Sequence, residues 1–437
     1  MNIKTMKLGM LVAAYACCAL AQAATFTADQ EADLPDLIPG NGFCNVFPQP
    51  GPGPCTLRAA IIEANALAGA DTINLLAGKT YTLNAAGTGE DTGYTGDLDI
   101  TDNLTIQFFA SGVTPVVSAD KIDRVFDVLS GNVTLLGFEI REGNATSTGS
   151  TSGGGILVRS GAGRVNLSFM RVVANTAELG GGMYNSGHDT HVGGSVFEND
   201  FFLGDAASTP SGSAIRNRGN LEITHSTFSN NRGILPELPP SMPQAFTTIA
   251  NAIDSSQQGA GTGGLRIVNS IFFYNDGNAI NIDDGVLELS SVTIAANSVL
   301  GLHMSDGSLL MHNSMIARNG FGDCLIGGAV STDTNRYNLD SDDSCGLAGG
   351  SSNRAGVNPQ LTPPADHGGP RLAIWPAPNS IAIDHGHPLF VANGCENDDA
   401  TFQDRPVDFD GDGAALCDIG AIELQHDVIF FDPFDRL

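Results

Sequence analysis

Three copies of one pattern stand in the second half of the chain: LRIVNSIFFYN (residues 265–275), VLELSSVTIAAN (286–297) and LLMHNSMIARN (309–319). Their final asparagines are spaced by 22 residues: Asn275, Asn297 and Asn319. A fixed period of this length is typical of stacked structural repeats. Apolar residues alternate within each copy and Asp-Gly pairs follow, which predicts short strands joined by tight turns.

Strands that repeat without an intervening helix can satisfy their backbone hydrogen bonds only with the repeats above and below. The pattern therefore predicts an all-β chain with a single-stranded parallel β-helix over residues 71–340, in which the three asparagines stack as a ladder from coil to coil. A leucine-rich repeat is the competing fold, because LSSVTIAANSV (289–299) satisfies its consensus. Ser270 and Ser314 break that consensus in the sister copies, so the β-helix is favoured.

The composition suits a turn-rich all-β solenoid, with 54 glycines and 16% charged residues among 437. A net charge of −28 disfavours nucleic acid, anionic membranes and polyanionic substrates as partners. Residues 1–23 combine two lysines, an apolar run and Ala-Gln-Ala, and are predicted to be a secretory signal peptide. We expect no transmembrane span in the mature chain, and a secreted or cell-surface location.

Six cysteines follow the signal peptide, in three local pairs: Cys44 with Cys55, Cys324 with Cys345, and Cys395 with Cys417. In an exported protein an even number of cysteines favours disulfides over a metal site. Proximity in sequence is only a guide, since six cysteines allow about 15 connectivities.

Residues 24–70 are predicted to form an N-terminal cap. Apolar residues after Cys55 recur on one helical face: Leu57, Ala60, Ile61, Ala64 and Leu67. Strand-like alternation begins after Gly69. A short helix at this place would cover the first coil, whose strand edges and core are otherwise exposed.

The segment CTLRAAIIEANA (55–66) resembles the Cys-Ser-Leu-Arg-Glu-Ala segment of CSLREA-domain proteins, which are exported bacterial β-helix proteins related to polymorphic outer-membrane proteins. Thr56 and Ala59 depart from that motif, whereas Cys55, Arg58 and Glu63 match it. The resemblance implies a right-handed β-helix in the envelope of a bacterium.

Residues 341–426 follow the repeats, and with the residues just before them they resemble the choice-of-anchor Q region of the same exported proteins. The matching motifs occur in the family order: YNLD (337–340), GGP (368–370), DRP (404–406) and DIGAIE (418–423). That resemblance implies an irregular, disulfide-bearing C-terminal cap and no known chemistry. The tail 427–437 is either an attachment device or a last strand, and residues 232–263 interrupt the period as an inserted loop.

One acidic loop is predicted to bind Ca²⁺, the one cofactor that the sequence suggests. Its carboxylates alternate around glycine and are Asp408, Asp410 and Asp412, with Asp418 further on. A hard cation needs several oxygens from a tightly turned loop. The twelfth position of an EF-hand would be Ile419, so we expect a looser calcium loop, with a solvated acidic turn as the alternative.

Two groups of side chains are candidates for catalysis or zinc. The acidic group comprises Asp283, Asp284, His303 and Asp306, whose carboxylates could act as the acid and base of glycosidic cleavage. Turn propensity explains Asp284-Gly285 and Asp306-Gly307 equally well. The histidine pairs His188 with His191 and His385 with His387 lack a clear third ligand for zinc.

These patterns favour a non-catalytic β-helix protein that binds a polysaccharide or a surface protein in an adhesion role. The alternative is a polysaccharide-active enzyme, a glycoside hydrolase or lyase, that acts in a groove of the β-helix. A purely structural coat protein is a third hypothesis.

Overall fold

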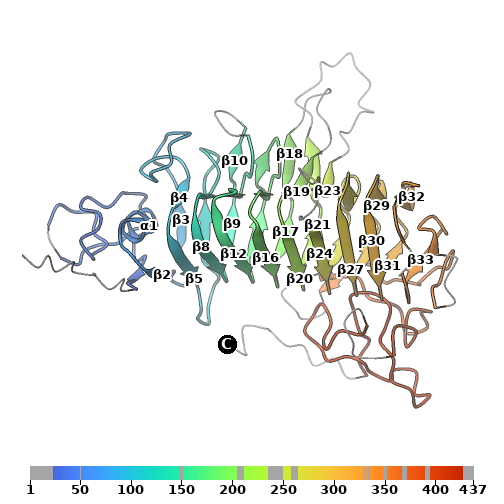
Figure 1. Cartoon of the computed structure of the whole chain (residues 1–437). Coiled ribbons are helices and arrows are strands. Elements are labelled where there is room, and N and C mark those ends of the chain that lie inside the picture. The colour runs from blue at the N-terminus through green and yellow to red at the C-terminus, as the bar shows by residue number, and fades with distance from the viewer. Residues whose placement is uncertain are drawn as a thin grey trace, which may run out of the picture.

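The computed structural model describes residues 23–49, 51–146, 151–203, 211–234, 250–256, 264–328, 330–332, 335–347, 352–366, 372–388 and 394–426. Three long parallel sheets run side by side along one axis, so that the chain forms a parallel β-helix (Figure 1). The fold predicted from the 22-residue period is confirmed.

The first sheet has ten strands: β1 (Thr25–Thr27), β2 (Ala70–Asn74), β5 (Asn103–Gln107), β8 (Gly131–Leu136), β12 (Ala162–Ser168), β16 (Asp189–Gly193), β20 (Leu221–Thr224), β24 (Gly264–Val268), β27 (Val286–Ser290) and β30 (Ser308–His312). The second sheet has nine: β4 (Leu98–Ile100), β7 (Phe126–Val128), β11 (Ile156–Val158), β15 (Met183–Asn185), β19 (Gly212–Asn217), β23 (Asn251–Ser255), β26 (Ile280–Ile282), β29 (Leu300–Met304) and β32 (Gly322–Ile326).

The third sheet has ten strands: β3 (Thr80–Thr82), β6 (Val116–Ser118), β9 (Glu139–Arg141), β13 (Arg171–Val173), β17 (Val196–Glu198), β21 (Thr227–Ser229), β25 (Ile271–Phe273), β28 (Thr293–Ala295), β31 (Met315–Ala317) and β33 (Leu339–Asp340). A four-stranded sheet joins β10 (Asn144–Ala145), β14 (Thr176–Ala177), β18 (Phe201–Leu203) and β22 (Arg232–Ile234). Outside the coils, β34 (Ala365–Asp366) pairs with β35 (Leu372–Ala373).

One coil passes through the three sheets in turn, as β24, β25 and β26 do before β27 returns to the first sheet. The register places Ile267 against Leu289 and Leu289 against Met311, all of which are fully buried. Equivalent apolar residues therefore stack in the core, where each contributes roughly 1.5–3 kcal/mol by leaving water.

The predicted asparagine ladder is present and longer than the sequence suggested. The amide nitrogen of Asn275 donates to Oδ1 of Asn297 at 2.9 Å, and that of Asn297 donates to Oδ1 of Asn319 at 3.0 Å. Asn231 extends the ladder on one side and Asp323 on the other. The residue before each of the three asparagines has a positive φ of 54–60° (Tyr274, Ala296 and Arg318). This conformation is unfavourable for non-glycine residues, and the ladder offsets part of its cost.

The N-terminal cap contains α1 (Leu57–Ala66), which Thr56 caps by accepting the backbone N–H of Ala59. We predicted one apolar face, but every residue from 57 to 64 is buried. Segments on two sides of the helix explain the difference. From the N-terminal segment, Asp33 forms an ion pair with Arg58 at 2.5 Å, and Glu63 accepts the backbone N–H of Gly40 at 2.6 Å; from residues 93–97, three carbonyl oxygens accept from Arg58. Arg58 and Glu63, which match the CSLREA segment, thus hold the cap together.

The segment 232–263 differs from the predicted inserted loop. Residues 251–255 form β23, which lies in the second sheet between β19 and β26, and residues 232–234 form β22. Short strands interrupted by Pro- and Gly-rich stretches carry too little periodic signal to be recognised, so the coil was missed. Residues 235–249 and 257–263 of the predicted loop lie outside the described residues, as do residues 1–22 of the predicted signal peptide and the tail 427–437.

The C-terminal region covers both the end and one side of the β-helix. Cys345 and Leu347 join the main core above the last coil. Farther along, Trp375, Ile383 and Ile422 belong to a second core that they share with the outer face of β25, β28 and β31 (Figure 1).

All three predicted disulfides are formed: Cys44–Cys55, Cys324–Cys345 and Cys395–Cys417. Disulfides of this number are typical of proteins that mature in an oxidising compartment. Across the described ranges, no helix is both long and apolar enough to span a membrane.

Candidate functional site

The outer face of the first sheet carries a row of charged side chains. Register places His191 of β16 beside Glu222 of β20, then Arg266 of β24, then Glu288 of β27. Alternation along each strand turns these residues outward, because their neighbours on either side face the core. We call Asp189, His191, Glu222, Arg266 and Glu288 the charged row.

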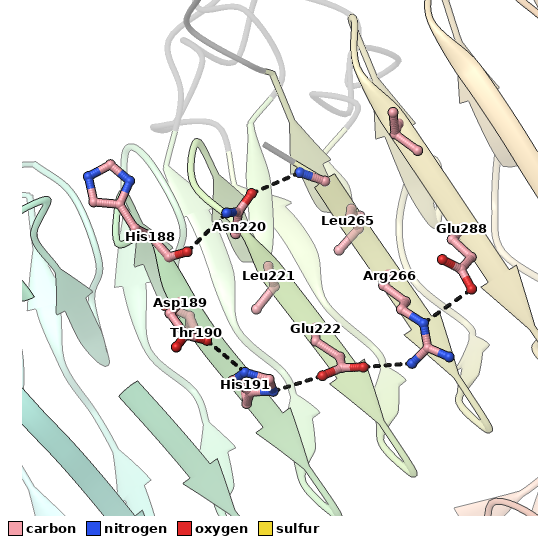
Figure 2. Close-up of a pocket in the computed structure, with 12 residues that line it drawn as sticks. His188, Asp189, Thr190, His191, Asn220, Leu221, Glu222, Leu265, Arg266 and Glu288 are labelled. Carbon is pink, nitrogen blue, oxygen red and sulfur yellow. Dashed lines mark hydrogen bonds and ion pairs between the residues drawn. The ribbon is translucent and has the colours of Figure 1, made fainter. Parts of the chain in front are cut away.

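Each member of the charged row is paired with the next (Figure 2). The ring nitrogens of His191 lie 2.8 Å from Asp189 and 2.8 Å from Glu222. Arg266 lies 2.6 Å from Glu222 and 3.1 Å from Glu288, so one guanidinium bridges carboxylates on two different coils. At the end of the row, a hydrogen bond from Arg164 of β12 lowers the pKa of Asp189.

A shallow groove of about 350 Å³ runs across this face. It is lined by residues of four successive strands and the turns before them: His188, Asp189, Thr190, His191, Asn220, Leu221, Glu222, Gly264, Leu265, Arg266, Val286 and Glu288. Four strands at the usual spacing give it a length of roughly 14 Å. One wall is fixed by Asn220, which donates to the carbonyl oxygen of His188 at 3.0 Å and accepts from Gly264 at 3.1 Å.

The groove can bind polar groups but is poorly suited to acid–base catalysis. Cleavage of a glycosidic bond by two carboxyl groups needs one that holds a proton and one that is free to act as base or nucleophile. Here, Glu222 is bonded to both His191 and Arg266, and Glu288 is bonded to Arg266. The paired charges instead offer a fixed series of donors and acceptors, which hydroxyl groups can match.

The predicted catalytic residues divide into two groups. Asn281 of β26 joins Asp283 and His303, because its amide donates to Asp283 at 3.2 Å and its Oδ1 lies 2.6 Å from Nδ1 of His303. Asp284 and Asp306 are exposed at successive turns. A Cβ on Gly307, which has a φ of +106°, would lie 2.0 Å from the carbonyl oxygen of Gly285, so these turns stack and require glycine.

Asn281 also contacts Asp254, which the sequence did not single out. Asp254 accepts from Asn281 at 2.9 Å and forms an ion pair with Arg216. Burial raises the pKa of Asp254 to about 6, although Arg216 opposes the shift. Its side chain is only 1% exposed, so it cannot reach a glycosidic oxygen in the structure described.

Asp254 belongs to a second row of polar side chains, on the outer positions of the second sheet. Register connects Asp99, Asp127, Arg216, Asp254 and Asn281, with Leu157 and Tyr184 between Asp127 and Arg216. We call these five polar residues the buried row, because none exposes more than 8% of its whole-residue surface, backbone and side chain together. Burial and then Asp97 raise the pKa of Asp99 to about 8.

The predicted calcium loop is only partly assembled as expected. Asp408 and Asp410 come together with Asp384, and oxygens of all three lie within 4.8 Å of one another. Asp418 is instead fully buried, where it accepts the backbone N–H groups of Asp384 and Leu424 at 2.8 Å. Asp412 accepts only the N–H of Ala414. The third carboxylate is therefore Asp384, from a segment 24 positions before Asp408, which no local motif could reveal.

The histidine pairs do not form zinc sites within the described part of the chain. His191 is engaged by two carboxylates, and the ring of His188 points away from it (Figure 2). His385 contacts the carbonyl oxygen of Ile383, and His387 packs against the ring of Tyr337.

The charged row was missed at the sequence level except for His191. The spacing of two of its members could nevertheless have revealed it. Arg266 and Glu288 lie between apolar residues of equivalent copies and are 22 residues apart, so the period alone places them outward and side by side. The 22-residue spacing that aligns the core positions therefore also predicts this outward pair.

Comparisons with known proteins add little to this geometry. No family model matches the chain, and no curated protein matches it. Among solved structures it is similar to "Crystal structure of pectate lyase Pel9A", with 14% identity and a TM-score of 0.44 over 92% of this chain and 97% of that one. It is also similar to "Rhamnogalacturonan lyase", with 12% identity and a TM-score of 0.42 over 78% and 91%. Likenesses this weak indicate no reaction or substrate, and the strand register itself defines the fold.

Proposed function

We propose that this protein is an exported β-helix protein that binds a neutral polysaccharide in the groove of the first sheet and does not cleave it. The supporting observation is the charged row, a half-exposed and fully paired series that crosses four coils. A chain of sugar hydroxyls can donate to the carboxylates and accept from Arg266 without leaving a charge unpaired.

The charge of the molecule favours a neutral glycan over an acidic one. Three carboxylates line the groove together with one arginine and two histidines, and the whole chain has a net charge of −28. An acidic polysaccharide would meet repulsion at long range and would find no unpaired arginine or lysine in the charged row. A location of the protein at the cell surface or in the secreted fraction is an expectation from the predicted signal peptide and the disulfides.

Binding should be measured by affinity electrophoresis against a panel of neutral and acidic polysaccharides, with wild type and Arg266→Ala. We expect retention by at least one neutral glycan, and a loss of affinity of about tenfold or more in the variant, since hydrogen bonds to a charged group contribute roughly 1.5–3 kcal/mol. The matched control is Arg171→Ala: Arg171 also bridges two carboxylates, Glu139 and Glu198, each at 2.8 Å, but on the third sheet.

Three outcomes would overturn the proposal. Equal binding by Arg266→Ala and wild type would place the ligand elsewhere. New reducing ends or unsaturated products would establish the enzymatic alternative and direct attention to the exposed carboxylates of Asp283, Asp284 and Asp306. No retention by any glycan would favour a protein partner or a structural role.

A further inference from the structure

The three carboxylates of Asp384, Asp408 and Asp410 form a site that the proposed function does not use. Asp384 lies in a segment that follows Ser380, whereas the other two lie on the 408–413 loop. Their oxygens approach within 4.8 Å of one another, although Asp384 is buried and Asp410 is exposed. Such proximity is unfavourable for three negative charges unless a cation or protons compensate them.

Asp384 provides a second, independent observation. The residue is only 6% exposed, and its Oδ1 is buried and accepts no hydrogen bond of good geometry from the described residues, although the backbone N–H of Leu416 also acts on this carboxylate. Its other oxygen accepts the backbone N–H groups of Phe409 and Asp410, each at 3.1 Å. These contacts hold the carboxylate against the loop, and the unsatisfied oxygen costs free energy unless a ligand contacts it.

The second acidic cluster in the described residues serves as a contrast. Asp91, Asp99 and Asp127 are also close together, and Oδ1 of Asp99 is also unsatisfied. There, however, the guanidinium of Arg159 lies 3.2 Å from Asp91 and 2.6 Å from Asp127. That cluster already contains its cation. No ion pair joins a basic side chain to Asp384, Asp408 or Asp410 within the described ranges. His426 stacks on Phe409, and its Nε2 lies beside the backbone oxygen of Asp408 rather than its carboxylate.

We propose that Asp384, Asp408 and Asp410 hold one Ca²⁺ ion that ties the 408–413 loop to the Asp384 segment. Calcium accepts carboxylates in irregular geometry and takes about 6–8 oxygens, so water and backbone carbonyls would complete the shell beside the exposed Asp410. Magnesium fits less well because it demands near-octahedral geometry at short distances.

The ion would act on the packing of the whole C-terminal region. Asp384 donates its N–H to Asp418, and the neighbouring Gly386 donates to the carbonyl oxygen of Cys417. Gly420 donates to the carbonyl oxygen of Asn313, on a corner of the β-helix. Ca²⁺ therefore stabilises the contact between this region and the coils. Burial raises the pKa of Asp384, as does the nearby Asp410, and a bound cation would reverse that shift.

The test is isothermal titration of Ca²⁺ into the EDTA-treated, disulfide-intact mature protein, together with thermal unfolding in EDTA and in Ca²⁺. We expect one binding site and a higher Tm in Ca²⁺. Asp410→Asn removes an exposed ligand without disturbing a buried group, and we expect it to weaken binding about tenfold or more. Asp384→Asn should abolish binding; if it fails to fold, Asp410→Asn still decides the matter.

Asp412→Asn is the matched control, because Asp412 is exposed on the same loop and lies outside the cluster. It should bind Ca²⁺ as wild type does. The proposal is overturned if wild type gives neither heat nor a change in Tm, if Asp412→Asn loses as much affinity as Asp410→Asn, or if Mg²⁺ binds as strongly as Ca²⁺.

Discussion

The charged row and the buried row are built in the same way and have opposite properties. Each is a series of outward strand positions that the register brings side by side across the coils. In the charged row, the side chains of Arg266 and Glu222 are 40% and 33% exposed. In the buried row, those of Arg216 and Asp254 are 10% and 1% exposed. The two rows therefore differ in how much of each side chain is exposed to solvent, and not in residue type.

The difference shows what desolvation does to a repeated arrangement of charges. An ion pair near water is screened and contributes little to stability, but it stays accessible to a ligand. A buried pair is unavailable to a ligand, and removal of one partner leaves an uncompensated charge. The same solenoid thus carries a row suited to binding and a row suited to structure.

The largest expected effect is the loss of stability in Arg216→Ala. This change leaves Asp254 buried with only Asn281 as a partner, and we expect a loss of about 3–5 kcal/mol in the free energy of unfolding at neutral pH. Chemical denaturation at pH 7 measures it. The loss should be smaller at pH 5, because the pKa of Asp254 is already about 6 and rises further without Arg216. A loss of less than about 1 kcal/mol at pH 7 would mean that ion pairs of the buried row contribute no more to stability than those of the charged row.

Asn297→Ala separates burial from charge. Asn297 is 1% exposed, accepts from the amide of Asn275 and donates to Asn319, so the variant leaves buried partners unsatisfied without changing any charge. We expect a loss of about 1–3 kcal/mol for each buried group left without a partner. Because Asn297 itself contacts no titrating group among the described residues, the loss should be the same at pH 5 and pH 8. A strong dependence on pH would mean that the ladder is coupled to Asp323 at its end or to the buried row.

The buried row should make stability depend on pH. Burial raises the pKa of Asp99 to about 8 and that of Asp254 to about 6, whereas an unfolded aspartate titrates near 3.9. Between these values the folded protein binds more protons than the unfolded one, so stability falls as pH rises from about 4 to 8. We expect a higher Tm at pH 5 than at pH 8, and a smaller difference in Asp99→Asn.

The control for that slope is Asp189→Asn, in the charged row. Its pKa is lowered by Arg164, so its contribution is lost only as pH falls below the unfolded value. The slope between pH 5 and pH 8 should therefore be unchanged. If Asp189→Asn reduced the change of stability with pH as much as Asp99→Asn, burial of the carboxylates would not be the cause of that change.

The smallest expected effect on stability is that of Arg266→Ala. Its two ion pairs are exposed, and pairs of this kind contribute about 0–1 kcal/mol. We expect denaturation curves close to those of wild type, in the same variant for which we expect glycan binding to fall. A loss of several kcal/mol would show that the charged row is a structural element, and its loss of binding would then be uninformative.

The repeats allowed much of the fold to be predicted, whereas the candidate sites were predicted only in part. The 22-residue period fixed the core stack of Ile267, Leu289 and Met311, and the ladder at Asn275, Asn297 and Asn319. The strand at 251–255 was missed, because one coil interrupted by irregular sequence breaks the period. Asp283 and His303 were predicted together and are joined by Asn281, but Arg216 and Asp254 were not foreseen.

What the sequence determined by itself is the repeating order of inward and outward residues, because alternation along a strand and a constant coil length are local properties of the chain. The local cysteine pairs belong to the same class, since a separation of 11–22 residues is bridged within one coil or cap. Only the tertiary structure decided which outward row is covered and which carboxylates meet. Exposure depends on which segments pack over a row, and the approach of Asp384 to Asp408 depends on the path of irregular segments that have no repeat. Desolvation and charge proximity act through space.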